Sequence, residues 1–259
     1  MQIKASGLTH SGMVRGNNED CFEIFPDEIQ EISYHSDNLY TITDGMGGAA
    51  SGEVASLLAI QTIKETFTSP YLLPSTVISN YTDAVAKRLE YAVYLANKRL
   101  REEIVKHHQL KGMGTTVVAL HVEYEMVYIL HVGDSRCYRI RDGKIKLMTT
   151  DHSFVWGMYE KGIIPFEEIN IHPRRNVITR AIGIEDELLC DILIEPIKSG
   201  DFFLLCSDGL SDMVTEDKMQ QIILDASGDL QKICKGLVNE ANLCGGKDNI
   251  TVIVLEIRD

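Results

Sequence analysis

Acidic residues recur in this sequence at positions typical of turns, each beside an apolar segment rich in β-branched or aromatic residues. They are Glu19 and Asp20 in VRGNNED, Asp44 in TDGMGG, Asp134 in HVGDSR, Asp208 in CSDGLSD and Asp248 in GGKDNI. Small neighbours such as glycine let backbone and solvent approach a carboxylate, and carboxylate oxygens are the ligands that Mg²⁺ and Mn²⁺ prefer. We therefore predict one metal site, gathered from the whole chain.

A turn is the simpler interpretation of any one of these acids, because Asp beside Gly is common in turns. Asp142-Gly143 illustrates this, since it lies between RCYRIR and KIKLM and predicts a hairpin turn with no chemical role. The other acids differ because the strand-like segments NLYTIT, YILHV, DFFLLCS and NITVIV adjoin them directly. That shared arrangement favours the metal site.

The composition is that of a folded, soluble protein with a large core: of 259 residues, 44% are hydrophobic and 24% are charged. The net charge of -13 argues against a broad cationic surface for nucleic acid and against binding to anionic membranes. A phosphate-bearing substrate would have to be attracted locally, by metal ions and a few arginines.

The six cysteines are scattered without a C-x-x-C pair, which favours a reducing compartment. The first residues lack the apolar core of a signal peptide, and no apolar run reaches the roughly 18 residues of a membrane span. We expect a cytoplasmic protein that does not interact with membranes.

Short β-branched and aromatic runs predict strands, and apolar residues at helical spacing predict helices. The expected strands cover residues 2–8, 21–25, 39–43, 189–194, 202–206 and 250–257, and the expected helices cover 52–68, 80–108, 216–226 and 229–243. Four further β-runs between Gly114 and Met148 have short connections, which predict an antiparallel meander. Strand and helix runs are grouped rather than alternating, so we expect one α+β domain over residues 1–259, with a helix pair on each face of packed sheets.

Other chemistries find little support in the sequence. Gly45 to Ala50 fits the dinucleotide pattern G-x-G-x-x-A, but Asp44 would lie against the pyrophosphate, and the next helix leads to Ser69-Pro70 rather than to a second parallel strand. The sequence contains no phosphate loop, zinc helix, nucleophile elbow or cysteine with arginine six residues later. Its eight histidines show no ligand spacing.

The motifs together resemble those of the metal-dependent serine/threonine protein phosphatases of the PPM type (protein phosphatase 2C), in particular the compact bacterial form. The similarity runs almost end to end, through VRGNNED, DGMGG, GTT, GDSR, DHS, RNVITRAIG, SDGLSD and KDNITVIV in that order. It implies an α-β-β-α sandwich of two antiparallel sheets flanked by helix pairs, with two Mn²⁺ or Mg²⁺ ions bound at one end.

The resemblance also implies a role for each acid. Asp44 would bridge both ions, and Gly45 would offer its backbone carbonyl to the second. Asp208 and Asp248 would complete the coordination of the first ion.

Four further acids follow from the same resemblance. Glu19 and Asp20 match the pair that ligates the second ion or holds its waters. Asp134 and Asp212 match residues that, with Asp208, hold a weaker third ion. A cap at a helix start within GLSDM is the alternative role for Asp212.

Two divalent ions about 3.5 to 4 Å apart can share a water and make it a nucleophile near neutral pH. The implied reaction is attack on the phosphorus of phosphoserine or phosphothreonine, with Arg15 holding phosphoryl oxygens through its planar fork. An ion pair with Glu19 is the alternative role for Arg15. The implied partners are phosphorylated proteins, substrates of a serine/threonine kinase, and we expect a monomer.

The sequence departs from the family pattern at Met46 and Ala49, where relatives carry histidine, so a metal-bound water would have to protonate a leaving alkoxide, or turnover would be slower than in relatives. Residues 153–182 resemble the flap that borders the catalytic cleft, and a packed helix pair is the alternative interpretation. Two other functions remain open. A phosphoprotein-binding pseudophosphatase would be expected to have lost metal carboxylates, and an esterase of small phosphates would share the same cluster.

Overall fold

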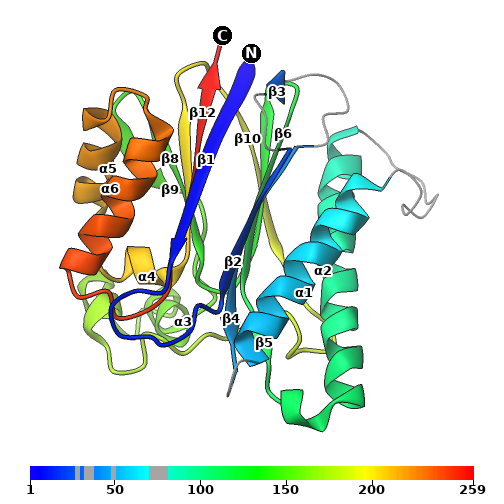
Figure 1. Cartoon of the computed structure of the whole chain (residues 1–259). Helices are drawn as coiled ribbons and strands as arrows, with labels where there is room; N and C mark the ends of the chain where they lie inside the picture. The colour runs from blue at the N-terminus through cyan, green and yellow to red at the C-terminus, as the bar shows by residue number, and fades with distance from the viewer. Residues whose placement is uncertain (27–29, 32–37, 48–50, 70–80) are drawn as a thin grey trace.

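Two antiparallel sheets pack face to face, and helices cover the outer face of each in the computed structural model (Figure 1). The structure describes residues 1–26, 30–31, 38–47, 51–69 and 81–259. The predicted α+β class and the α-β-β-α sandwich are therefore confirmed. None of the described helices combines the length and the apolar character that crossing a bilayer requires.

The first sheet has the strand order β3-β1-β12-β11-β8-β9. Its strands are β1 (Gln2–His10), β3 (Gln30–Glu31), β8 (Arg136–Arg141), β9 (Lys144–Leu147), β11 (Phe202–Cys206) and β12 (Ile250–Arg258). Helices α5 (Glu216–Asp225) and α6 (Leu230–Leu243) cover its outer face.

The second sheet has the order β10-β7-β6-β4-β2, with β5 paired to the end of β4. Its strands are β2 (Asp20–Phe25), β4 (Leu39–Met46), β5 (Gly114–Thr115), β6 (Val117–Glu123), β7 (Met126–Val132) and β10 (Asp191–Pro196). Helices α1 (Ser51–Thr68) and α2 (Tyr81–Lys106) cover it, and a 3₁₀ turn (His108–Leu110) follows α2.

Strand β12 shows why the central strands are apolar along their whole length. Val252 and Val254 pack in the core beneath α6, whereas Ile253 and Leu255 pack in the core between the sheets. Side chains of a strand point alternately to its two faces, so a strand buried on both faces is apolar at every position.

The predicted meander between Gly114 and Met148 is wrong. β6 pairs with β7 in one sheet and β8 pairs with β9 in the other, so two hairpins replace one continuous meander. The turn at Gly133 crosses between the sheets, with φ of 106°. Facing sheets lie about 10 Å apart, which three extended residues can span, so connection length cannot distinguish a hairpin from a crossing.

Two other expectations concern single turns. Asp142-Gly143 is the predicted hairpin turn, since Arg141 pairs with Lys144 and both turn residues have positive φ (53° and 72°). Strand β4 continues beyond its predicted end at Thr43, because Gly45 pairs with Thr115 of β5. Asp44 therefore lies within a strand and not in a turn.

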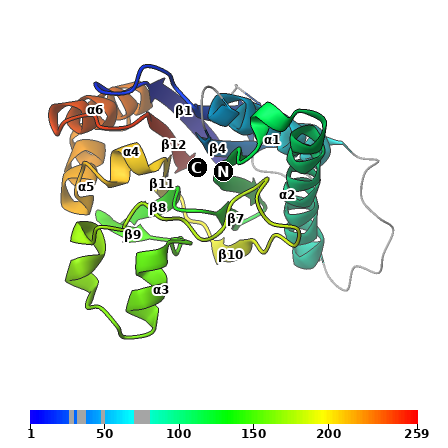
Figure 2. The ribbon, with the colours of Figure 1, turned by 90° about the horizontal axis from the view of Figure 1, so that it is seen from below.

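The segment that resembles the flap lies at one end of the sandwich (Figure 1) and projects outward beyond β9 (Figure 2). It contains helix α3 (Phe154–Glu160), capped by the Ser153 hydroxyl, and a 3₁₀ helix (Phe166–Ile171). Val155, Ile164 and Ile169 form a small core of its own. The packed-helix interpretation is thus correct in part, because one of the two helices is 3₁₀.

Candidate metal centre

A pocket of about 250 Å³ lies at the end of the sandwich where β4 ends and the short helix α4 (Asp208–Ser211) begins. Its lining includes most of the predicted site residues: Arg15, Glu19, Asp44, Gly45, Asp134, Asp208 and Asp248. They come from segments more than 200 residues apart in the chain. The structure therefore brings the predicted cluster together, with Asp20 and Asp212 outside the lining.

Strand pairing places the first acids. Asp20 of β2 lies directly opposite Asp44 of β4, and the Gly45 N–H donates to the Glu19 carbonyl (3.1 Å). A side chain at position 45 would put its Cβ 2.1 Å from the carbonyl oxygen of Gly52. Glycine is required at this position because α1 approaches the strand so closely.

The turn before β12 holds Asp248, an acid of the other sheet. Asn249 donates to the carbonyls of Ser11 and Asn17, and its Oδ1 accepts from the Glu19 N–H (2.8 Å). Its neighbour Asp248 accepts a hydrogen bond from Arg15 Nη2 (2.6 Å). The Arg15 loop and the Asp248 turn are thereby fixed to one another. The predicted alternative, an ion pair of Arg15 with Glu19, is therefore wrong, because Arg15 pairs with Asp248.

Asp20 lies behind the pocket and is 5% exposed. Its Oδ2 accepts from the Ser207 hydroxyl (2.8 Å), but its buried Oδ1 has no hydrogen-bond partner among the described residues. Burial is the largest cause that raises the pKa of Asp20, to about 6. An orphaned buried carboxylate oxygen fits a site that receives a cation or a cation's water.

The electrostatics of the pocket also fit a cation. The pKa values of Asp44 and Asp208 are raised well above the ordinary range, first by burial and then by neighbouring carboxylates. Burial, followed by the charge of Asp151, raises the pKa of Asp134 to about 7. Among the described lining residues Arg15 is the only cation, so the charge of the acids is largely uncompensated by protein groups.

A second, smaller hollow adjoins the first and is lined by Asp134, Asp208 and Asp212, the three acids of the implied third site. Asp212 follows the last residue of α4, so its alternative role as a cap at a helix start is wrong. Arg175, from the flap segment, has its Nε 3.6 Å from Asp212 Oδ2.

Several contributors were not singled out from the sequence. Asn249 and Ser207 lie inside recognised motifs, but their hydrogen bonds join segments distant in the chain, which no local pattern reveals. Arg136 has a structural role, because it makes a bidentate pair with Asp151 (2.9 and 2.6 Å). Met46 lines the pocket, whereas Ala49 lies outside the described residues.

Comparison with known proteins agrees with this fold and pocket. The family model described as Protein phosphatase 2C matches residues 26–232. The chain is 32% identical to the serine/threonine phosphatase stp of Listeria innocua, over 98% of this chain and 96% of the relative. It is 34% identical to the serine/threonine protein phosphatase PstP of Mycobacterium tuberculosis, over 99% of this chain and 45% of the relative.

Solved structures give the same result. The serine/threonine phosphatase Stp1 of Staphylococcus aureus superposes with a TM-score of 0.86 at 31% identity, covering 99% of this chain and 96% of that one. The catalytic domain of PstP in complex with two manganese ions superposes with a TM-score of 0.81 at 29% identity, covering 100% and 99%.

Fold and pocket thus define a protein of the phosphatase class built on two packed sheets. The chain belongs to the protein phosphatase 2C family.

Proposed function

We propose that this protein is a Mn²⁺- or Mg²⁺-dependent phosphatase that removes phosphate from phosphoserine and phosphothreonine in proteins, and so opposes serine/threonine kinases. The observation that carries the proposal is the pocket itself, where Glu19, Asp44, Asp134, Asp208 and Asp248 line one cavity and Arg15 is the one arginine among the described lining residues. Relatives that match nearly the whole chain are named serine/threonine phosphatases, and one solved relative contains two manganese ions.

Two divalent ions would supply a water nucleophile at neutral pH and neutralise charge on the phosphoryl group. Asp44, the Gly45 carbonyl, Asp208 and Asp248 would hold them, because these groups line the cavity. The set contains only oxygen donors, which is the preference of Mg²⁺ and Mn²⁺ and gives no means of choosing between them.

Four further acids, Glu19, Asp20, Asp134 and Asp212, lie in or around the same cavity. Glu19 lines the cavity and Asp20 lies behind it, so we assign them to the second ion and to its waters. Asp134 and Asp212 would hold a weaker third ion together with Asp208, because all three line the adjoining hollow.

Arg15 would bind the phosphoryl oxygens. Its guanidinium is about half exposed at the cavity mouth, where it can exchange its Asp248 contact for a phosphate. A planar fork of donors matches two oxygens at once, which orients the phosphate for in-line attack. The described lining contains no imidazole, so solvent would protonate the leaving alkoxide.

The flap supports a protein substrate in preference to a small phosphate ester. Trp156, Tyr159 and Phe166 form a cluster of edge-to-face rings, and Phe166 is 55% exposed. Exposed aromatic side chains suit contact with a polypeptide, and the same segment lines the metal pocket through Asn176 and Ile178. We also propose that residues 1–259 act as one catalytic domain, as a cytoplasmic monomer in signal transduction.

The test is hydrolysis of a phosphothreonine peptide by the purified protein with Mn²⁺, with chelator, and after Asp208→Asn. We expect activity only in the first case, and faster turnover of the peptide than of p-nitrophenyl phosphate at equal concentration. Activity that survives both chelation and the substitution would overturn the mechanism. Turnover of p-nitrophenyl phosphate alone would favour an esterase of small phosphates, and binding without turnover would favour a pseudophosphatase.

A further inference from the structure

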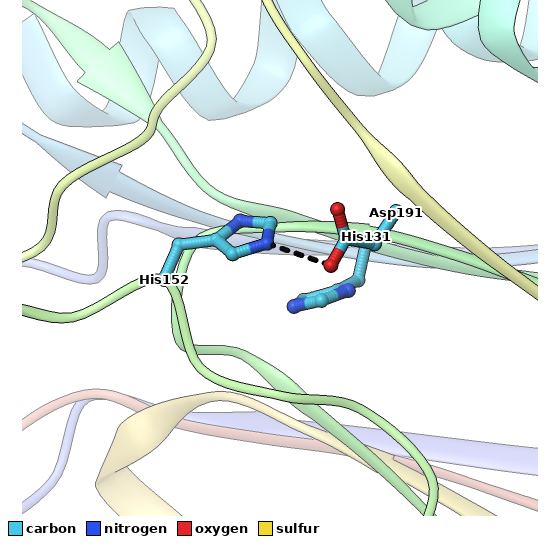
Figure 3. Close-up of side chains that lie close together, drawn as sticks. All are labelled: His131, His152 and Asp191. Atoms are coloured by element: carbon cyan, nitrogen blue, oxygen red, sulfur yellow. Dashed lines mark ion pairs between the residues drawn. The ribbon is translucent and has the colours of Figure 1, made fainter. Parts of the chain in front are cut away.

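A second polar cluster lies outside the metal pocket, at the base of the flap. His131 of β7 and Asp191 of β10 are directly paired across the second sheet, so their side chains share one face. The ring of His152 stacks on that of His131 with centroids 4.3 Å apart, and its Nε2 lies 3.2 Å from Asp191 Oδ2 (Figure 3). Both imidazoles are buried, whereas Asp191 is half exposed.

Hydrogen bonds fix where the protons of both rings lie. His131 Nε2 is 2.7 Å from the Thr150 carbonyl, which can only accept, so this nitrogen carries the proton. His152 Nδ1 accepts from the Gly133 N–H (3.1 Å), which leaves the proton of the neutral ring on Nε2, 3.2 Å from Asp191 Oδ2. The Arg180 guanidinium can only donate, so its hydrogen bond in this cluster is the one to Asp191 Oδ1 (3.0 Å). Hydrogen bonds thus run from the Gly133 backbone through the His152 ring to Asp191.

A metal ion is not the best account of these three side chains, although one donor atom from each lies within 4.8 Å of the others. The metal would have to replace the proton on His152 Nε2. It would also have to displace the guanidinium of Arg180, whose Nη1 lies 3.0 Å from that nitrogen and 3.0 Å from Asp191 Oδ1. Arg180 already compensates the charge of Asp191.

His152 is joined to two functional segments. Its N–H donates to the Gly133 carbonyl and its ring accepts from the Gly133 N–H, which fixes the turn just before Asp134. Its carbonyl accepts from the Thr179 N–H, and through Asp191 its ring reaches Arg180 at the end of the flap. Through its backbone and its ring, His152 therefore contacts both the end of the flap at Thr179 and Arg180 and the turn before Asp134.

We infer that His152 is a positioning residue that couples the flap to the metal centre, with Asp191 and Arg180 as its link to the flap and Gly133 as its link to Asp134. This inference rests on the proposed phosphatase function. Asp134 lines the metal pocket beside Asn176 and Ile178 of the flap. A change at either end of the link would therefore alter how a phosphopeptide is held against the metal site.

Position 133 is well suited to transmit such a change. Gly133 has φ of 106°, and a Cβ there would lie 2.6 Å from the Thr116 side chain. Its backbone conformation is thus open almost only to glycine, and the two hydrogen bonds with His152 hold it there. Loss of the ring acceptor would leave the Gly133 N–H without its partner and release the turn.

Two substitutions at position 152 test separately the contact of His152 with Gly133 and its contact with Asp191. Asparagine places its Oδ1 near the position of Nδ1, so His152→Asn keeps an acceptor for Gly133 and loses Asp191. Glutamine places its amide near Nε2, so His152→Gln keeps a donor for Asp191 and loses Gly133. His131→Gln is the matched control, because it is buried in the same cluster and keeps its donor to Thr150 but touches neither Gly133 nor Arg180.

The readouts are Mn²⁺ affinity by calorimetry, KM and kcat for a phosphothreonine peptide and for p-nitrophenyl phosphate, and the emission of Trp156. Trp156 is the only tryptophan of the chain and lies in α3 of the flap. We expect His152→Asn to raise the peptide KM about tenfold and to shift the Trp156 emission, with Mn²⁺ affinity and kcat for the small ester within about twofold of wild type. Asp191→Ala should behave in the same way.

We expect His152→Gln to weaken Mn²⁺ binding and to lower kcat for both substrates about tenfold, with little change in Trp156 emission. His131→Gln should stay within about twofold of wild type in every readout. The inference is overturned if the two variants at position 152 behave alike, or if His131→Gln has the same effects. Wild type that fails to hydrolyse the peptide would defeat the proposed function instead, while Mn²⁺ binding and Trp156 emission would still report on the coupling.

Discussion

Asp208→Asn should have opposite effects on stability and on activity. Asp208 is buried, and its pKa is raised well above the ordinary value by burial first, then by Asp134, Asp212 and other acids. Two unit charges 10 Å apart repel by about 1.7 kcal/mol at an effective dielectric constant of about 20. Partial protonation of the cluster lowers this cost. We therefore expect the amide to raise the free energy of unfolding of metal-free protein by about 1–3 kcal/mol at pH 8.

Thermal unfolding in chelator measures this effect. One kcal/mol corresponds to about 2–4 °C in a chain of this size, so Tm should rise by about 2–12 °C. At pH 5 the gain should shrink, because a carboxyl with a raised folded pKa costs stability progressively as pH rises from its unfolded pKa of about 3.9 to the folded value, and at pH 5 only part of that cost has accrued. With Mn²⁺ at 100 times its Kd the wild type should gain about 2.7 kcal/mol. The variant should gain less and lose about 100-fold or more in phosphopeptide hydrolysis.

Asp225→Asn is the matched control for this substitution. Asp225 is exposed at the end of α5, so removing its charge should change stability by less than about 0.5 kcal/mol and leave activity intact. The reasoning is refuted if Asp208→Asn destabilises the protein in chelator at pH 8. It is equally refuted if the variant gains as much stability from Mn²⁺ as the wild type.

Three further predictions follow from the pocket. Arg15→Gln should lower kcat/KM for a phosphopeptide about 10- to 100-fold, with partial recovery in Arg15→Lys; steady-state kinetics showing no loss would remove Arg15 from phosphate binding. In chelator, Tm should fall as pH rises from 5 to 7, because a carboxyl with a raised folded pKa, about 6 for Asp20 and about 7 for Asp134, costs stability between its unfolded pKa of about 3.9 and that folded value, and saturating Mn²⁺ should abolish the trend. A chelator-treated protein that becomes more stable over that range would contradict the assignment. Ala49→His should leave turnover unchanged or raise it, since it adds a proton donor, and a clear fall in kcat would count against solvent as the acid.

Local sequence patterns were enough to predict much of the fold and most of the candidate site residues. The spacing of apolar residues predicted the strands and helices. The Asp142-Gly143 pair between two strand-like runs predicted the hairpin turn, because a two-residue turn depends on its own residues and not on distant contacts. The acids of the pocket could be recognised because each adjoins an apolar strand. Their convergence is set by sheet pairing, such as Asp20 opposite Asp44, and the structure was needed to show it.

The features that sequence reasoning missed depend on distant contacts. The crossing at Gly133 replaces the expected meander because both arrangements satisfy the same short connection. Asn249 fixes the Glu19 loop from the other end of the chain, and His152 acquires its partners only when β7, β10 and the flap meet. Histidine spacing along the chain therefore gave no sign of that cluster.

The most direct test of the central claim is an anomalous difference map at the manganese absorption edge, from crystals soaked in Mn²⁺. We predict two peaks in the pocket between Asp44, Asp208 and Asp248, with Asp44 contacting both. The claim is contradicted if these three carboxylates point away from one another with no peak between them, in protein that still hydrolyses a phosphopeptide.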